Sequence, residues 1–121
     1  MKKALSFILI AFMFVFFACS SSYGQDPVKV NPKVYKFLFE NDRVRVFEIS
    51  FEAGEEIGVH SHPDHVVYVM TDGKLAITEV DKEPMEADLK AGQVMYLPAQ
   101  THSAINIGET QIKAVVVEIK D

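Results

Sequence analysis

Three of the chain's four histidines lie within a six-residue stretch, and this cluster carries the clearest chemistry in the sequence. His60 and His62 are two residues apart. On a β-strand, residues at that spacing point to the same face, with Cα atoms about 6.5–7 Å apart. Two imidazole rings on one face can converge on one metal ion. The fourth histidine, His102, lies much later, in a second patterned stretch, so the histidines are the first candidates for metal ligands.

The chain has a single cysteine, Cys19, in an N-terminal segment that we expect to be removed or lipidated. The mature domain then has no thiol, so it can form no disulfide and offers no thiolate to a metal. Any metal ligands in it must therefore be nitrogen or oxygen atoms.

Residues 1–24 are predicted to be a signal peptide. They begin with a methionine and two lysines, continue with an almost unbroken apolar run over residues 4–18, and end with small, mostly polar residues. About fifteen apolar residues fall short of the roughly 18–20 that a membrane-spanning helix needs, so we expect no stable transmembrane segment after processing. Cleavage after Gly24 and lipoprotein processing before Cys19 both remain open. The protein is thus expected to be exported, to the periplasm or lipid-anchored at the cell envelope.

The charge of the mature chain restricts its partners. All 17 acidic residues but only ten of the 12 basic ones follow residue 24, which gives a formal charge of 10 − 17 = −7. An acidic domain without a cluster of lysine and arginine argues against nucleic acid as a partner. A small-molecule ligand or a protein partner remains open.

The candidate ligands need elements that position them, and the mature chain reads as a series of short strands. Apolar and polar residues alternate in short segments, with Gly, Pro and Asp turns roughly every ten residues. No long stretch shows the period of a helix. The pattern predicts an all-β barrel or sandwich, with residues 25–42 as a lead-in and residues 43–121 as the barrel.

Other residues carry narrower expectations. Asp72-Gly73 is the strongest hairpin signal and predicts that the segments on its two sides pair with each other. Glu118 is a polar position on the last predicted strand, without an assigned role. Several large side chains could line the mouth of the barrel, but we expect them to form ordinary core: Phe47, Tyr68, Met70, Met95 and Tyr96.

Two motifs, in this order, resemble those of the cupin superfamily. The first is carried by Gly54, His60, His62 and Gly73. The second is carried by Gly92, Pro98, His102 and Asn106. The resemblance covers residues 43–120, extends to small single-domain bacterial cupins, and implies a double-stranded β-helix, which is a small jelly-roll barrel. That fold agrees with the strand pattern.

The first motif departs from the family pattern at one metal ligand. Where the family has a glutamate after the histidine pair, this chain has Val66 or Val67, and neither can bind a metal. The resemblance therefore implies three metal ligands, His60, His62 and His102, without the carboxylate.

Three nearby polar residues carry further expectations. His65 lies one residue before the glutamate position and could be a spare ligand, although a turn histidine that faces solvent is the favoured interpretation. Gln100 stands where the second motif often has a glycine, and its amide could either support a metal-bound group or face water. We expect Asn106 to close a turn through its side-chain hydrogen bonds.

A site of three neutral imidazoles implies a divalent metal ion, with iron, zinc, manganese, nickel and copper all open. Three ligands leave positions free for water and substrate. Without the glutamate the site carries more positive charge, which favours a small polar or anionic molecule as ligand.

Two hypotheses follow from these features. The first is an exported enzyme with dioxygenase-type or isomerase-type chemistry. The alternative is a non-catalytic cupin module that binds a small ligand or a partner protein and has a degenerate metal site. Dimers are common among similar small cupins, so a homodimer is also considered.

Overall fold

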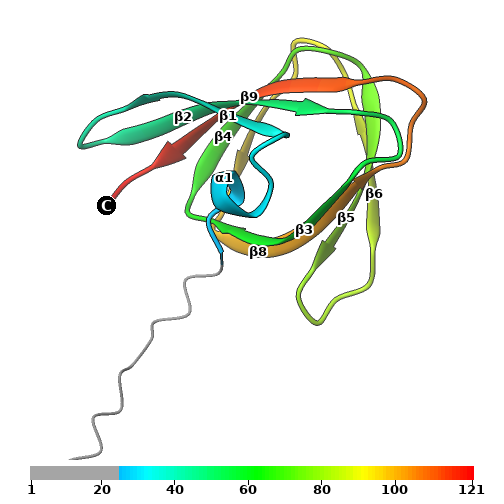
Figure 1. Ribbon diagram of the computed structural model, residues 1–121, viewed down its shortest axis with the longest axis horizontal. Coiled ribbons are helices and arrows are strands. Elements are labelled where there is room, and N and C mark those ends of the chain that lie inside the picture. The colour runs from blue at the N-terminus through cyan, green and yellow to red at the C-terminus, as the bar shows by residue number, and fades with distance from the viewer. Residues whose placement is uncertain (1–24) are drawn as a thin grey trace, which may run out of the picture.

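Nine strands and one short helix make up residues 25–121, the part of the chain that the computed structural model describes (Figure 1). The predicted signal peptide, residues 1–24, lies outside the described residues. The elements are α1 (Pro27–Val30), β1 (Tyr35–Glu40), β2 (Val44–Phe51), β3 (Glu56–His62), β4 (His65–Val69), β5 (Gly73–Glu79), β6 (Met85–Leu89), β7 (Val94–Leu97), β8 (Gln100–Asn106) and β9 (Ile112–Ile119). Within this part of the chain, no helix is long and apolar enough to cross a membrane.

The strands form two antiparallel sheets that enclose the core between them (Figure 1). One sheet has the strand order β1-β2-β9-β4-β7, and the other has the order β3-β8-β5-β6. Neighbours in both sheets are mostly distant in sequence, because the chain repeatedly crosses from one sheet to the other. The predicted all-β fold, a double-stranded β-helix, is confirmed.

The inner faces of the two sheets form one apolar core. On β9, Ile112, Ala114 and Val116 are buried, while the residues between them are only partly buried. A strand produces this alternation when one of its faces meets the core. Buried apolar side chains from other strands join them: Phe47, Phe51, Ile57, Val69, Leu89 and Ala104. The same alternation decides which polar side chains of these strands point inward.

Residues 25–42, predicted as a lead-in, carry α1 and β1. β1 is an edge strand of the five-stranded sheet and pairs with β2. Asp26 accepts two hydrogen bonds, at 2.6 and 2.8 Å, from the guanidinium of Arg45 on β2. This pair fixes the segment to the barrel and brings Tyr35, the first residue of β1, to the histidine cluster.

The predicted hairpin at Asp72-Gly73 is wrong. β4 pairs with β7 and β9, whereas β5 pairs with β6 and β8 in the other sheet. The chain crosses between sheets here, and Gly73 is not among the glycines with positive φ. A Cβ added at Gly73 would lie 2.4 Å from Cγ1 of Ile112, so this position needs glycine because Ile112 packs closely against it.

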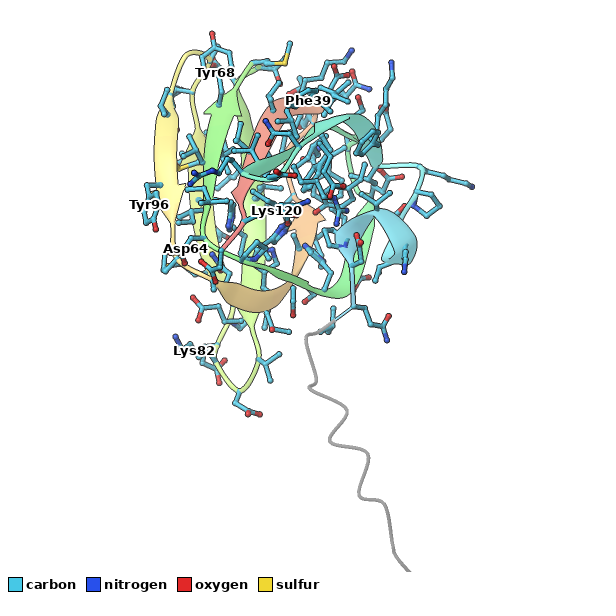
Figure 2. All side chains as sticks on the ribbon, turned by 90° about the vertical axis from the view of Figure 1, so that its left-hand side faces the viewer. Phe39, Asp64, Tyr68, Lys82, Tyr96 and Lys120 are labelled. Carbon is cyan, nitrogen blue, oxygen red and sulfur yellow. The ribbon has the colours of Figure 1, made fainter. Side chains whose placement is uncertain are left out.

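The five large side chains predicted to be core divide into two groups. Phe47 is fully buried and Met95 packs against the core, as predicted. Tyr68, Met70 and Tyr96 are 48%, 43% and 60% exposed, so that prediction is wrong for them. Both tyrosines point outward from the five-stranded sheet (Figure 2), because they occupy the alternate face of β4 and β7.

The side chain of Asn106 closes the turn after β8, as predicted. It is fully buried, its Nδ2 donates to the carbonyl oxygens of Phe51 and Thr110, both at 2.9 Å, and its Oδ1 accepts from the backbone N–H of Gly108 at 3.0 Å. These three bonds tie the end of β8 to the end of β2 and to the turn before β9.

We predict that Asn106→Ala lowers the free energy of unfolding by about 2–3 kcal/mol, because it leaves buried backbone groups without partners. Asn41→Ala is the matched control, since Asn41 Oδ1 accepts from two backbone N–H groups in an exposed turn, and its loss should cost about 1 kcal/mol or less. Urea unfolding measures both. Equal losses in the two variants would contradict this role for Asn106.

Candidate metal centre

The three predicted ligands come from two neighbouring strands. His60 and His62 lie on β3, and His102 lies on β8, which pairs with β3 in the four-stranded sheet. The register places His60 directly opposite His102. Because alternate residues of a strand share a face, His62 points to the same side as His60. The three side chains are 0%, 6% and 8% exposed, so all three are buried inside the barrel.

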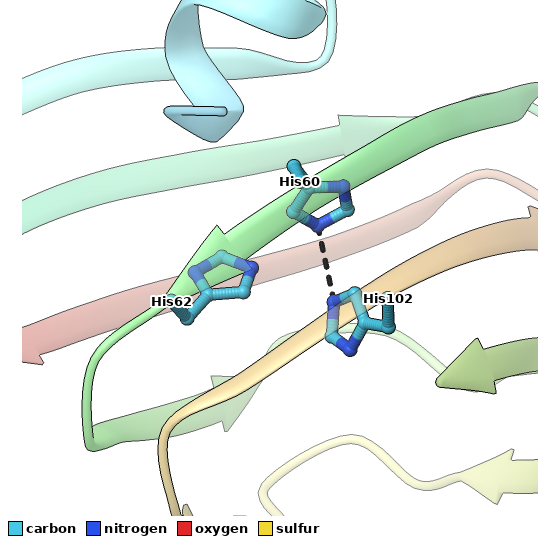
Figure 3. Close-up of side chains that lie close together, drawn as sticks. All are labelled: His60, His62 and His102. Atoms are coloured by element: carbon cyan, nitrogen blue, oxygen red, sulfur yellow. Dashed lines mark hydrogen bonds between the residues drawn. The ribbon is translucent and has the colours of Figure 1, made fainter. Parts of the chain in front are cut away.

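The rings approach closely enough to share one ion (Figure 3). Ring centroids are 4.9 Å apart for His60 and His62, 4.6 Å for His60 and His102, and 5.2 Å for His62 and His102. One ring nitrogen from each histidine lies within 4.8 Å of the other two. The structure thus brings together all three residues predicted from the sequence.

Each ring is oriented by a hydrogen-bond acceptor at Nδ1. The acceptors are Gly58 O for His60 at 2.7 Å, Glu118 Oε2 for His62 at 2.9 Å and Gln100 Oε1 for His102 at 2.9 Å. Carbonyl and carboxylate oxygens cannot donate, so Nδ1 carries the proton and Nε2 of each neutral ring keeps a lone pair. This is the arrangement that metal-binding histidines need.

The facing Nε2 atoms fit a bound ion. His60 Nε2 and His102 Nε2 are 3.0 Å apart. Two lone pairs at that distance repel unless a proton or a cation lies between them. Imidazole nitrogens bind zinc at about 2.0–2.1 Å, so two of them on one ion are about 3.0 Å apart at the right angle of a six-coordinate site and about 3.3–3.4 Å apart at the tetrahedral angle usual for zinc. The donor set suits iron, zinc, copper and nickel.

Burial keeps the cluster in its ligand form. It lowers the pKa of His62 and of His102 to about 3, and neighbouring imidazoles add to the shift in both. Burial also lowers the pKa of His60, although the Gly58 carbonyl opposes that change. At neutral pH the three rings are therefore neutral, which is the form in which imidazole binds a metal ion.

Glu118 is a site residue to which sequence reasoning assigned no role. It is 4% exposed, and its other carboxylate oxygen lies 3.8 Å from Nη1 of Arg45. Burial raises the pKa of Glu118, and Arg45 opposes this by favouring the carboxylate, the form that accepts from His62. Glu118 lies at an even spacing from Ile112 and Val116 on β9, so the alternation of the strand predicts that its side chain points inward. This was the signal in the sequence that could have identified it as a site residue.

Tyr35 is a second residue that sequence reasoning missed. Its hydroxyl lies 3.1 Å from His60 Nε2, and it donates there because the other ring nitrogen carries the proton. Burial raises the pKa of Tyr35, so the hydroxyl stays protonated. No sequence signal pointed to it, since it lies in the expected lead-in.

The structure also decides the roles expected for His65 and Gln100. The prediction that His65 faces solvent is wrong, since its side chain is 2% exposed. It points inward because β4 begins at His65, directly after a two-residue turn. Its Nδ1 donates to Pro63 O at 2.7 Å, and its ring centroid is 4.6 Å from that of His62. Gln100 does not simply face water, because its Oε1 holds the Nδ1 proton of His102.

Comparison with known proteins identifies the family. The profile of the Cupin domain matches residues 47–118, more than half of the chain, so the chain belongs to the cupin family. The resemblance drawn from the two motifs is confirmed. A comparison with curated proteins found no match.

Solved structures agree with this assignment. A cupin domain from Bordetella pertussis Tohama I is 33% identical, with a TM-score of 0.68, over 73% of this chain and 93% of that chain. An RmlC-like cupin family protein with a double-stranded β-helix fold, from Methanocaldococcus jannaschii, is 25% identical, with a TM-score of 0.57, over 71% of this chain and 78% of that chain. An uncharacterized conserved protein with a double-stranded β-helix domain, from Klebsiella pneumoniae, is also 25% identical, with a TM-score of 0.58, over 71% and 75%.

The lowered histidine pKa values predict how the metal-free protein responds to acid. The unfolded chain binds protons at His62 and His102 below about pH 6.5, whereas the folded chain does so only near pH 3. Stability should therefore fall as the pH drops through about 6.5.

Thermal unfolding in the presence of a chelator, at about pH 7.5 and pH 5.5, measures this loss. The double variant His62→Gln, His102→Gln is the control, because it removes both groups and keeps the acidic residues. A loss of melting temperature as large in this variant as in the native chain would contradict the prediction.

Proposed function

We propose that this cupin domain binds one divalent metal ion through Nε2 of His60, His62 and His102 and acts on a small molecule that binds to that ion. One observation carries the proposal. Three buried imidazoles lie close together while an acceptor holds the Nδ1 proton of each, so the lone pair of every ring is on Nε2. The approach of His60 Nε2 and His102 Nε2 to 3.0 Å costs free energy unless a proton or a cation lies between them.

The proposed chemistry follows from the donor set. Three neutral ligands leave coordination positions open and leave the charge of the ion uncompensated, which favours an anionic or chelating ligand. The ion would supply Lewis-acid chemistry for an isomerase-type reaction or, if it is iron, redox chemistry for a dioxygenase-type reaction.

The protein's own residues would support such a site. Glu118 and Gln100 hold the rings of His62 and His102 in one tautomer and one orientation. Arg45 ties Glu118 to Asp26, so the support reaches the N-terminal segment. The apolar core around the rings limits the access of water.

A non-catalytic binding module is the second candidate. Among the described residues, no carboxylate and no lysine or arginine lines the interior cavity beside the histidines. The general acid or base that many reactions need would then have to be His65 or Tyr35, both of which line the cavity. A ligand that raises the melting temperature without any metal would favour this module over the enzyme.

We predict that His60→Ala and His102→Ala abolish stoichiometric metal binding and leave the barrel folded. Ser61→Ala is the matched control, because Ser61 lies between the two β3 ligands but its Oγ contacts Thr101 Oγ1 at 2.6 Å on the other face. Elemental analysis of untagged protein measures the metal, and circular dichroism checks the fold. A native chain without metal, or a histidine variant that keeps it, would refute the proposal.

We also propose that the protein is exported, on the strength of residues 1–24 of the sequence. The mature chain then begins at Gln25 or at a lipidated Cys19. Mass spectrometry of the protein from fractionated cells distinguishes the two products, and an uncleaved chain in the cytoplasm would contradict export. Both products keep Asp26, which binds Arg45, and Tyr35, which contacts His60.

A further inference from the structure

An interior cavity of about 280 Å³ lies between the two sheets, next to the metal centre. Nineteen residues line it, and all but four of them are apolar. The four polar ones are Tyr35, His62, His65 and His102. A cavity lined in this way offers very few hydrogen bonds to a bound molecule, so most of any occupant must be apolar.

The polar groups gather at one end of this cavity. His65 lies opposite Glu118 at one end of the pairing between β4 and β9. At the other end of the barrel, Phe51 lies opposite Ile112, and Gly73 lies opposite Leu89. The cavity therefore has a polar end, where the imidazoles lie, and the rest of it is apolar and extends away from that end.

A recess on the outside borders the same cavity. It has a volume of about 590 Å³ and shares four residues with the cavity: Ile77, Met85, Leu97 and His102. Met85 is 62% exposed, so its flexible side chain lies at the surface between the recess and the cavity. The charged residues of the recess, including Lys82 and Glu83, do not line the cavity itself. A ligand would thus leave polar surroundings as it enters.

The buried hydroxyl of Tyr35 would need a new hydrogen-bond acceptor once a metal ion is bound. It donates to His60 Nε2, the same lone pair that a metal ion would use. Once the ion occupies that lone pair, the buried hydroxyl needs another acceptor, because a buried donor without a partner is costly. An oxygen anion on a metal-bound ligand would lie next to it and could accept this hydrogen bond.

We infer that the ligand of this site is a small amphipathic acid, with one carboxylate head at the metal and Tyr35 and with an unsubstituted aliphatic or aromatic body in the apolar cavity. This inference rests on the proposed metal centre, which supplies the positive charge that the carboxylate needs. It narrows the polar or anionic molecule expected from the sequence, since only the head is polar.

The test is calorimetric titration of the zinc-loaded protein with straight-chain carboxylates from acetate to octanoate. Each added methylene should strengthen binding about fourfold, which corresponds to ~0.8 kcal/mol of apolar burial, until the cavity is full. 6-Hydroxyhexanoate has the same carbon chain as hexanoate and no hydroxyl that can chelate the ion together with the carboxylate, but the far end of its body is polar, so it should bind more weakly than hexanoate. Affinities that do not change with chain length, or equal binding of 6-hydroxyhexanoate and hexanoate, would overturn the inference.

Two kinds of variant locate the binding. Tyr35→Phe should weaken hexanoate at least tenfold and leave the zinc content unchanged, because it removes only the donor to the head. Ala114→Leu should fill the cavity and weaken octanoate at least tenfold while acetate binds as before, and Ala87→Leu is the substitute if that variant does not fold. Unchanged affinities in these variants would place the acid elsewhere.

Failure of the metal centre and failure of the inference give different results. Absence of bound zinc would refute the metal centre and, with it, the carboxylate head. Titration of the metal-free protein with straight-chain alcohols then tests whether the cavity binds an apolar body. Binding that strengthens with chain length supports an apolar body, and binding that does not would overturn it.

Discussion

The antiparallel pairing of β3 with β8 places His60 opposite His102, and the chemistry of this barrel depends on that register. A shift of one residue would turn one of these histidines outward, because successive side chains point to opposite faces. Ile57 and Ala104 pair at the other end of the same two strands and are buried, but the register shifts between Ile57 and His60. This irregularity in β3 lets both Ile57 and His60 point inward, so it is needed to bring the imidazoles together, and a bound ion would add to the stability of this arrangement.

Much of the fold and of the site could be predicted from local pattern. The alternation of apolar residues in β9 and the turn residues between short strands indicated an all-β barrel. The spacing of His60 and His62 placed both on one face, whatever the rest of the chain did. His102 could be joined to them only through the resemblance to cupins, because no local pattern reports which strands become neighbours.

The remaining features depend on tertiary structure. Glu118 and Tyr35 reach the histidines from β9 and β1, and nothing in their own segments says that these strands lie near β3. His65 was expected to face solvent because it follows Pro63-Asp64, but β4 begins immediately after that turn. Asp72-Gly73 has the residues of a tight hairpin, yet the crossover between sheets and the contact with Ile112 decide its conformation.

The central claim is that three imidazoles share one ion through Nε2, each held at Nδ1 by a protein acceptor. Crystals of the untagged mature protein grown with zinc test it most directly, because anomalous scattering locates the ion. The claim predicts one zinc ion per chain, about 2.0–2.1 Å from Nε2 of His60, His62 and His102. An ion bound through Nδ1 or at another place, or no ion inside the barrel at saturating zinc, would contradict it.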